Sequence, residues 1–390
     1  METNKIYQGD WTELAQQLDD ESIDLILTSP PYWGLRDYGI SGQLGLEEHP
    51  SQYIKKLVEG FRILKKKLKR TGSCYINLGD TYFGGGKEVC PKSQYGHIKV
   101  KEKPNWLQPK QKMLMPHRVV IALQEDGWIC RNDIVWHKPS TMPTSVKDRL
   151  NTTFEFVFHL VKNKRYFYDL DAIREKHKEV SIQRNKFPLK EYLCKEAARN
   201  RAFQSGEFLN PKGKNPGDID KHHNHKNPGD FWEITTQPFL AAHFAVFPEE
   251  LCIKPIKSSC PEFVCKKCGS IKEKIIKSDN PSKGFMEWDA NRLSGAKGSF
   301  QSRQCIKSLH RNKGGVYSTA QFKGWKECAC NVGFESGIVL DPFMGAGTTA
   351  LVALKLNRQF IGFELKQEYI DIAMKRIKPW LEQTRLVVAR

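Results

Sequence analysis

A short polar and rigid stretch follows an apolar segment near the amino end of the chain. Residues 24 to 39 read DLILTSPPYWGLRDYG, so the apolar segment leads into Ser29-Pro30-Pro31-Tyr32. Proline fixes φ and has no N–H, which leaves carbonyl oxygens of this turn free to accept hydrogen bonds from a ligand. An exocyclic amino group is a suitable donor, and Tyr32 offers a flat face for a base taken out of a duplex. An ordinary diproline loop is the alternative.

A glycine-rich turn lies near the carboxyl end. Residues 337 to 365 read GIVLDPFMGAGTTALVALKLNRQFIGFEL, which predicts a strand, a turn, a helix and a second strand. Gly345 and Gly347 allow close approach of a ligand to the backbone, and Thr348 opens a helix whose amino end favours an anion. Glu364 ends the second strand, where it can accept hydrogen bonds from ribose hydroxyls. No lysine follows the glycines, so a nucleoside without a triphosphate fits better than a P-loop ligand. A nucleotide-binding fold without catalysis is the alternative.

Two pairs of cysteines form the third candidate site. Cys265 and Cys268 belong to CKKC, and Cys328 and Cys330 belong to CAC. Four thiolates are enough for a tetrahedral structural zinc site. The gap between the pairs is much longer than in an ordinary zinc ribbon, so unbound reduced thiols are the alternative. Cys260 or Cys305 could replace one of the four ligands.

Short Val/Ile/Leu-rich segments must position these motifs. They alternate with helical patterns, which is typical of βαβ units on a largely parallel sheet. Residues 51 to 70 place Ile54, Leu57, Phe61 and Leu68 at helical spacing. Ligands of such folds bind at the carboxyl edge of the sheet. The expected strands are Ile23 to Leu27, Cys74 to Leu78, Ile129 to Trp136, Phe154 to Val161, Ile338 to Leu340 and Phe360 to Phe363.

Composition narrows the class of protein. The 390 residues suffice for one large α/β domain with insertions or for two ordinary domains. A formal net charge of +18 favours a polyanionic partner, with nucleic acid as the first to test. The sequence shows neither a long apolar segment nor a secretory leader, so we expect a cytoplasmic protein without membrane contact. The eleven cysteines, including Cys74, Cys130 and Cys252 in apolar strand-like segments, favour reduced thiols over a disulfide framework.

Two stretches interrupt the α/β pattern. Residues 171 to 235 are polar, and residues 256 to 336 contain 15 basic against 7 acidic residues. We interpret both as insertions that extend away from the sheet.

The motifs TSPPY, DPFMGAGTT and GFEL together resemble those of the amino-methylating DNA methyltransferases that use S-adenosylmethionine. The resemblance covers most of the chain and includes RNDIVWHKPSTMPTSVKDR, NPGDFWEI and HFAVFPEEL. Because Ser29 to Tyr32 precede the glycine turn, the order is similar to that of the circularly permuted β class. It argues against the glutamine methyltransferases of release factors, which share a diproline motif. The implied fold is α/β: a circularly permuted Rossmann-like domain whose doubly wound sheet is mostly parallel, with one antiparallel strand near an edge.

The resemblance also implies a division of the chain. Residues 1–170 would form the catalytic half of the methyltransferase domain, and residues 337–390 its cofactor-binding half. Residues 171–235 would be the target-recognition segment, and residues 236–255 would return into the core. Residues 256–336 would be a basic, zinc-ribbon-like insertion.

Individual roles follow from the resemblance. Ser29 and the Pro30 carbonyl would hold the target amino group, beside Pro31, and Tyr32 would stack on the flipped base. Glu364 would bind the cofactor ribose, and Asp10 its adenine amino group. The methionine part would lie among Asp341, Phe343, Gly345, Gly347 and Thr348, with Phe247 and Pro248 packed against the same pocket.

The sequence supports amino-group chemistry independently. Methylation at cytosine C5 needs a cysteine nucleophile, usually in a Pro-Cys dipeptide, and none of the 20 prolines precedes a cysteine. An exocyclic nitrogen needs only orientation and a proton acceptor in a dry pocket. Serine before the diproline resembles the cytosine-N4 enzymes, and adenine N6 is the alternative.

We therefore predict a site-specific DNA methyltransferase that acts on double-stranded DNA by base flipping, with a possible cognate restriction endonuclease. The chain would be a monomer or a homodimer. Two other classes remain open: an RNA methyltransferase, because phosphate contacts contribute similarly for both polymers, and a non-catalytic nucleic-acid-binding protein.

Overall fold

A computed structural model describes residues 1–34, 39, 43–83, 107–177, 179, 225–236, 246–278 and 320–388. Its contacts divide the chain into two units. The first contains Met1–Ile173, Gly229–Lys272 and Cys328–Arg390, and the second contains Arg174–Pro228 and Glu273–Glu327. Most of the expected target-recognition segment, the middle of the expected insertion, and Cys305 lie outside the described residues.

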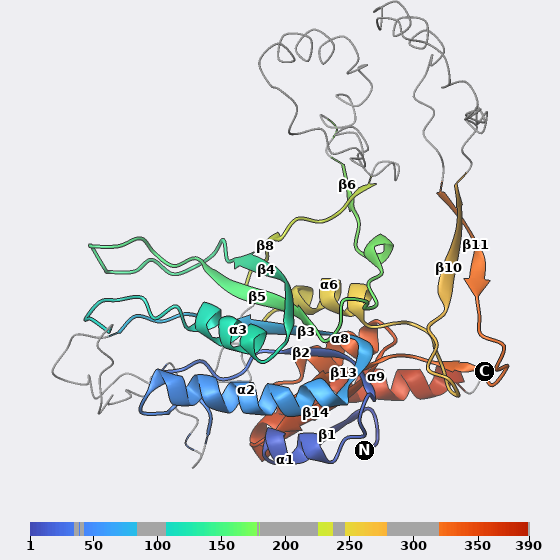
Figure 1. Cartoon of the computed structure of the whole chain (residues 1–390), viewed down its shortest axis with the longest axis horizontal. Coiled ribbons are helices and arrows are strands. Elements are labelled where there is room, and N and C mark those ends of the chain that lie inside the picture. The colour runs from blue at the N-terminus through green and yellow to red at the C-terminus, as the bar shows by residue number, and fades with distance from the viewer. Residues whose placement is uncertain are drawn as a thin grey trace, which may run out of the picture. The chain divides into compact units, whose positions relative to one another are not determined.

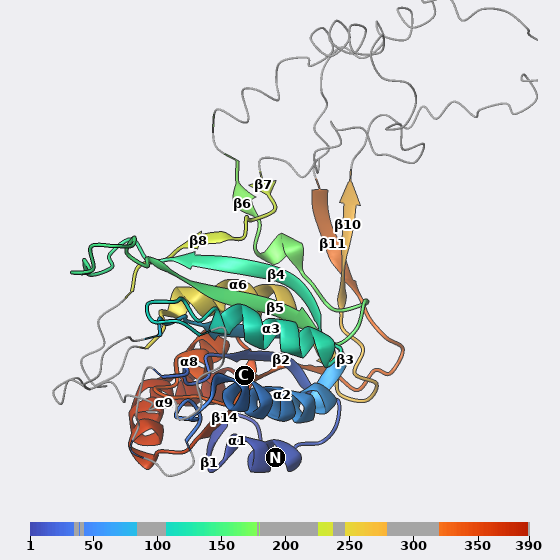
Figure 2. The same cartoon turned by 60° about the vertical axis from the view of Figure 1, so that its left-hand side comes forward.

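An eight-stranded sheet forms the centre of the first unit, in the order β1-β14-β13-β2-β3-β5-β4-β8 (Figures 1 and 2). Strand β5 runs antiparallel to both of its neighbours, and every other pair is parallel. The six expected strands and the single antiparallel strand near an edge are confirmed, whereas β1 and β8 were not predicted. The bounds are β1 Lys5–Gln8, β14 Gln359–Glu364, β13 Ile338–Asp341, β2 Ile23–Thr28, β3 Leu68–Leu78, β5 Phe154–Val161, β4 Ile129–His137 and β8 Phe231–Glu233.

Helices cover both faces of this sheet, which confirms the doubly wound fold (Figure 2). Successive strand residues point to opposite faces, so Ile26 packs with one group of helices while Leu25 and Leu27 pack with the other. The first face carries α1 Trp11–Gln16, α2 Pro50–Lys67 and α3 Met115–Glu125. The second carries α6 Glu249–Ser259, α8 Thr348–Lys355 and α9 Gln367–Val388.

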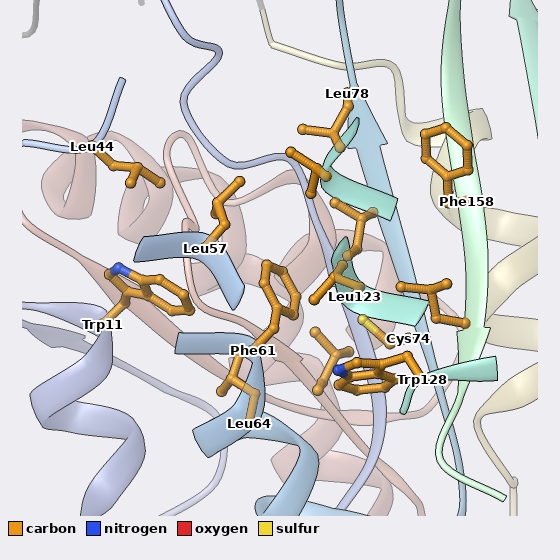
Figure 3. Packing of buried hydrophobic residues seen from close by; sticks show 14 of the residues in the cluster. Trp11, Leu44, Leu57, Phe61, Leu64, Cys74, Leu78, Leu123, Trp128 and Phe158 are labelled. Atoms are coloured by element: carbon orange, nitrogen blue, oxygen red, sulfur yellow. The ribbon is translucent and has the colours of Figure 1, made fainter. Parts of the chain in front are cut away.

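The core under α1 and α2 is built from large side chains. Trp11, Phe61 and Trp128 are all buried there, as Figure 3 shows. A methyl group added at Gly60 would lie 1.8 Å from Cη2 of Trp11, so α1 can pack against α2 only because this position has no side chain. Burying each such aromatic or leucine side chain contributes about 1.5 to 3 kcal/mol. This packing holds the amino end of the chain against the sheet.

Three details differ from the sequence-based expectations. Helix α2 ends at Lys67, and Leu68 begins β3 instead of extending the helix. Cys252 lies in α6 and not in a strand. The expected boundary between residues 255 and 256 falls inside α6, because two acidic residues in the first turn favour a helix start and the helix then continues through Pro255.

The remaining described strands are short pairs. In the first unit, β9 Val264–Cys265 pairs with β12 Phe334–Glu335. In the second, β10 Glu273–Ser278 pairs with β11 Ala320–Lys326, and β6 Glu175–Lys176 with β7 His225–Lys226. A 3-10 turn, η1, spans Leu170–Ala172. Within the described ranges, every helix is either too short or too polar to cross a bilayer.

Candidate active site

Four neighbouring strands end at the same edge of the sheet, because β1, β14, β13 and β2 are parallel. The loops after β1, β13 and β2 carry Asp10, the glycine turn and Ser29 respectively, and Glu364 is the last residue of β14. The backbone N–H of Gly9 donates to the carbonyl of Glu364 at 3.0 Å, which joins the first two ends. The candidate residues from both ends of the sequence therefore meet at one edge, where ligands of open α/β sheets bind.

A buried hydrogen bond joins the two principal motifs directly. The Thr28 hydroxyl donates to Oδ1 of Asp341 at 2.6 Å, across adjacent strands. Oδ1 also accepts from the Phe343 N–H at 3.1 Å, and Oδ2 accepts from the Thr349 hydroxyl at 2.6 Å. Burial raises the pKa of Asp341 to about 6. Asp341 is 0% exposed and accepts three hydrogen bonds from the protein, so it positions the two turns. Its expected place around the methionine part stays a prediction.

The two glycines of the turn serve different purposes. Gly345 has φ +52°, and a Cβ added there would meet nothing closer than the Phe343 carbonyl oxygen at 4.0 Å. Gly347 has φ +78°, and its added Cβ would lie 2.7 Å from Cβ of Ala373 in α9. Only Gly345 therefore leaves open space above the turn for a ligand, whereas Gly347 is required for the packing of α9.

Glu364 is fixed by the backbone of the same turn. Its Oε2 accepts from the Gly345 N–H at 2.8 Å, and its Oε1 accepts from the Lys366 N–H at 3.0 Å. Burial raises the pKa of this carboxyl group. An ionised carboxylate has about four acceptor positions, so these two contacts leave room for hydrogen bonds from a ligand.

Asp10 lies beside this turn through its neighbour Trp11, whose ring centroid is 4.8 Å from that of Phe343. The Asp10 side chain caps α1, with Oδ1 accepting from the Thr12 N–H at 2.8 Å. The Glu13 N–H and the Thr12 hydroxyl also donate to Oδ1, so Oδ2 accepts no hydrogen bond from the residues described.

Three other expected cofactor residues, whose contacts with the ligand stay predictions, also make contacts within the protein. Thr348 is the first residue of α8, and its hydroxyl accepts from Arg376 at 3.1 Å. Phe247 packs against the core under α6, and the buried Pro248 precedes that helix. The expected contact of Phe247 and Pro248 with the methionine pocket stays a prediction.

A hydrogen bond from α2 holds the diproline turn in place. The Pro31 carbonyl accepts from the Tyr53 hydroxyl at 2.8 Å, so that oxygen already has a partner. The Pro30 carbonyl accepts no hydrogen bond from any of the residues described, although Pro30 itself is buried. A buried carbonyl usually has a hydrogen-bonding partner, so the Pro30 oxygen stays the predicted acceptor for a ligand.

Tyr32 is anchored at its ring and at its hydroxyl. A Cβ added at Gly79 would lie 2.5 Å from Cε2 of Tyr32, so the ring packs directly on this glycine. The hydroxyl donates to Glu155 Oε2 at 2.8 Å and accepts from Asn77 Nδ2 at 2.7 Å and from Ser29 Oγ at 3.3 Å. Burial, and then the Glu155 charge, raises the pKa of Tyr32 well above its usual value. The tyrosine thus keeps its proton.

Sequence reasoning missed Asn77 and Glu155, which complete this arrangement. Each is a polar residue within a strand of otherwise apolar residues, CYINL and FEFVF. A polar residue at such a position needs a hydrogen-bonding partner, and this could have marked both as site residues.

The structure brings the four expected cysteines together. The sulfur atoms of Cys265, Cys268, Cys328 and Cys330 all lie within 4.8 Å of one another. Cys260 is buried away from them, where its Sγ would be 2.9 Å from a Cβ added at Gly337. Of the two possible substitute ligands, Cys260 therefore does not belong to the cluster.

Comparison with known proteins gives the site its context. The profile of a DNA methylase family, named for N6 and N4 methyltransferases, matches residues 23–271 and 328–375. The chain belongs to this N6/N4 DNA methylase family. The expected β-class amino DNA methyltransferase is confirmed.

Relatives among the Type II methyltransferases match this N6/N4 DNA methylase over nearly its whole length. It is 31% identical to the Type II methyltransferase M.SmaI of Serratia marcescens, over 96% of this chain and 90% of that one. It is 30% identical to M.Cfr9I of Citrobacter freundii, over 96% of this chain and 87% of that one. The solved PvuII DNA methyltransferase, described as cytosine-N4-specific, matches 96% of this chain and 86% of that one at 17% identity, with a TM-score of 0.52. This likeness supports the fold.

Proposed function

We propose that this chain transfers a methyl group from S-adenosylmethionine to the exocyclic N4 of cytosine in double-stranded DNA. The observation that carries the proposal is the buried bond between Thr28 and Asp341, which sets the amino-binding turn beside the glycine turn. A methyl transfer needs its two reactants fixed in contact, and such orientation supplies a large part of the rate. Two motifs from opposite ends of the sequence meet at one place for this purpose.

The residues present fit the cofactor. The open space above Gly345 admits the methionine part close to the backbone, and Glu364 and Oδ2 of Asp10 supply acceptors for ribose hydroxyls and an adenine amino group. When bound, S-adenosylmethionine supplies an electrophilic methyl group. The chain supplies the binding and the orientation, since both acceptors are held by backbone N–H groups before a ligand arrives.

The target base would be held by the diproline turn. The Pro30 carbonyl and Ser29 Oγ can accept from the two N–H bonds of an amino group, so that its lone pair points toward the cofactor. A base inside a duplex cannot reach this edge, which is why we propose that it is flipped out and stacked on Tyr32. The net charge of +18 favours contact with the phosphates on either side.

Cytosine N4 is proposed because serine precedes the diproline, as in the enzymes that the motif resembles. Adenine N6 is the second candidate, since the family profile includes both reactions. The relatives M.SmaI and M.Cfr9I are named as Type II methyltransferases. We therefore propose that methylation by this chain protects a specific DNA site from cleavage by a cognate restriction endonuclease.

The first prediction tests this function. Purified protein with labelled cofactor should methylate duplex DNA, and nucleosides released from the product should contain N4-methylcytosine by mass spectrometry. If the product contains N6-methyladenine and no N4-methylcytosine, the chain methylates adenine N6, the second candidate reaction. Methylation of RNA alone, or of neither polymer, would contradict it.

We also propose that the four cysteines hold a structural zinc ion. A tetrahedral site with Zn–S distances of about 2.3 Å has sulfur atoms about 3.8 Å apart, which agrees with the separations below 4.8 Å seen here. Each cysteine pair lies on a tight turn: Gly269 (φ +67°) follows the first, and Asn331 and Gly333 (φ +52° and +83°) follow the second. The Lys266 N–H donates to the Gly333 carbonyl at 3.3 Å and joins the two turns.

The second prediction concerns this metal. Protein purified without a chelator should carry about one zinc per chain, and Cys268→Ser or Cys328→Ser should each lower that content because one of four ligands is lost. DNA affinity and its salt dependence should fall as well, since the residues between the cysteine pairs are rich in lysine and arginine.

Cys130→Ser is the matched control. Cys130 is a half-buried thiol on β4 outside the cluster, so its replacement should leave the zinc content unchanged. If elemental analysis finds no zinc in the parent protein, the four cysteines are ordinary reduced thiols and the proposed metal site is wrong.

A further inference from the structure

We propose that Glu155 takes up the proton that the target amino group loses on methylation, delivered through Ser29 and Tyr32. This rests on the proposed amino-methyl transfer, and it names the proton acceptor that such a reaction requires. Glu155 itself does not contact the amino group; it acts through the two hydroxyls.

A continuous chain of hydrogen bonds supports this path. Ser29 Oγ donates to the Tyr32 hydroxyl at 3.3 Å, and that hydroxyl donates to Oε2 of Glu155 at 2.8 Å. Ser29 lies beside the Pro30 carbonyl, at the place proposed for the target base. The chain therefore leads from the reacting nitrogen to a carboxylate on β5.

Asn77 fixes the direction of every hydrogen bond in the chain. Its side-chain nitrogen donates both to the Tyr32 hydroxyl, at 2.7 Å, and to Oε2 of Glu155, at 2.8 Å. Because the Glu155 carboxylate can only accept and the Asn77 amide nitrogen can only donate, the Tyr32 hydroxyl gives its one proton to Glu155. Ser29 in turn gives its proton to Tyr32, so the lone pairs of Ser29 Oγ remain to accept an N–H of the base.

The proton balance closes without any further group. As the amino nitrogen bonds to the methyl carbon, the bond between that carbon and the cofactor sulfur would break and leave its electron pair on the sulfur. The positive charge would thereby move to the nitrogen, which must release one proton. That proton passes to Ser29 Oγ while the serine proton passes to Tyr32 and the tyrosine proton passes to Glu155. Both hydroxyls end as they began, and the carboxylate becomes a carboxylic acid that later exchanges with water.

The charges around Glu155 suit an acceptor that starts ionised. Lys138 forms an ion pair with Oε1, on the side away from Tyr32. Asn77 and Tyr32 face Oε2, and both are neutral donors. The side chains of Glu155 and Lys138 are each 19% exposed, so the accepted proton has a route to solvent.

The test replaces the carboxylate by its amide. Glu155→Gln keeps the size of the side chain but removes the basic oxygen pair, so the single-turnover rate of methylation should fall at least about 100-fold. Dissociation constants for S-adenosylmethionine and duplex DNA should stay within about threefold of the parent, because the carboxylate contacts neither. Glu233→Gln is the control: Glu233 is an exposed carboxylate on β8, two strands away from β5, and pairs with His137. Its amide should leave the rate unchanged.

Tyr32→Phe separates the proton path from base stacking. It keeps the ring and removes only the hydroxyl, so fluorescence of 2-aminopurine at the target position should report normal base flipping while the rate falls as in Glu155→Gln. The double variant should be no slower than either single variant, because both break one chain.

Glu155→Ala adds a readout that a purely structural role would not change. Added formate should restore its rate about tenfold, since a free carboxylate can accept the proton in place of Glu155. An unchanged single-turnover rate in Glu155→Gln, additive losses in the double variant, or failure of formate to rescue would overturn the path. A parent protein without methyl transfer would instead contradict the proposed function itself.

Discussion

Tyr32→Ala is expected to reduce methylation of duplex DNA by about 1000-fold or more, while S-adenosylmethionine binds as before. The change removes the stacking face, which contributes about 1 to 3 kcal/mol per base, and it also breaks the hydrogen bonds to Ser29 and Glu155. Because the cofactor residues lie on other strand ends, their geometry should not change. Single-turnover kinetics and calorimetric titration of the cofactor would measure the two effects separately.

The phenylalanine variant provides the comparison for this result. Since Tyr32→Phe loses only the hydroxyl, the difference in rate between it and Tyr32→Ala gives the share that comes from the ring. The melting temperature of both variants should be measured as well, because the ring packs on Gly79 and its loss can also lower stability. Normal turnover of folded Tyr32→Ala on duplex DNA would remove Tyr32 from the base-binding role.

Gly345→Leu is expected to weaken S-adenosylmethionine binding by about 10- to 100-fold or more. The leucine side chain would occupy the space that the bound cofactor needs, and such overpacking costs about 1 to 3 kcal/mol. The φ of +52° adds backbone strain of about 1 to 2 kcal/mol for a residue with a Cβ. The fold should survive, since a Cβ at this position meets no atom closer than 4.0 Å. Isothermal titration of the cofactor measures the loss.

Gly347→Ala is the matched variant, and it is expected to lower stability more than cofactor affinity. Its methyl group would lie 2.7 Å from Cβ of Ala373, so the melting temperature should fall because α9 must move. Gly345→Leu should therefore show the larger loss of affinity and Gly347→Ala the larger loss of stability. Unchanged cofactor affinity in Gly345→Leu would exclude this turn from the binding site.

Much of the architecture was predictable because periodicity and composition are local properties. The six apolar segments became strands, since burial on both faces demands continuous apolar residues. The short strand β1 was missed because Lys5 to Gln8 has mixed polarity, and its pairing with β14 is what makes it a strand. Helix α6 contains a proline and short apolar segments, so its helical character depends on packing against β2 and α8.

The motifs were predictable to a different extent. Sequence spacing predicted Ser29, Gly345 and Glu364, which lie at one edge of the sheet, and the four cysteines that cluster around one point. It could not show that Asp341 is fully engaged by Thr28 and Thr349, nor that Gly347 is required by α9. Such contacts join residues far apart in the sequence, and only the folded sheet brings them together. Glu155 and Asn77 escaped notice for the same reason.

The order of the strands also governs when the enzyme can become active during synthesis. Strands β1 and β2 are made first, yet their partners β14 and β13 come from residues 338 to 364. Until those residues have left the ribosome, one edge of β2 has no neighbour, and such long-range pairing is slow to form. Thr28 likewise waits for Asp341, so a nascent or prematurely terminated chain carries Ser29 to Tyr32 without a cofactor turn beside them. We therefore expect that a chain which stops before β14 does not methylate DNA.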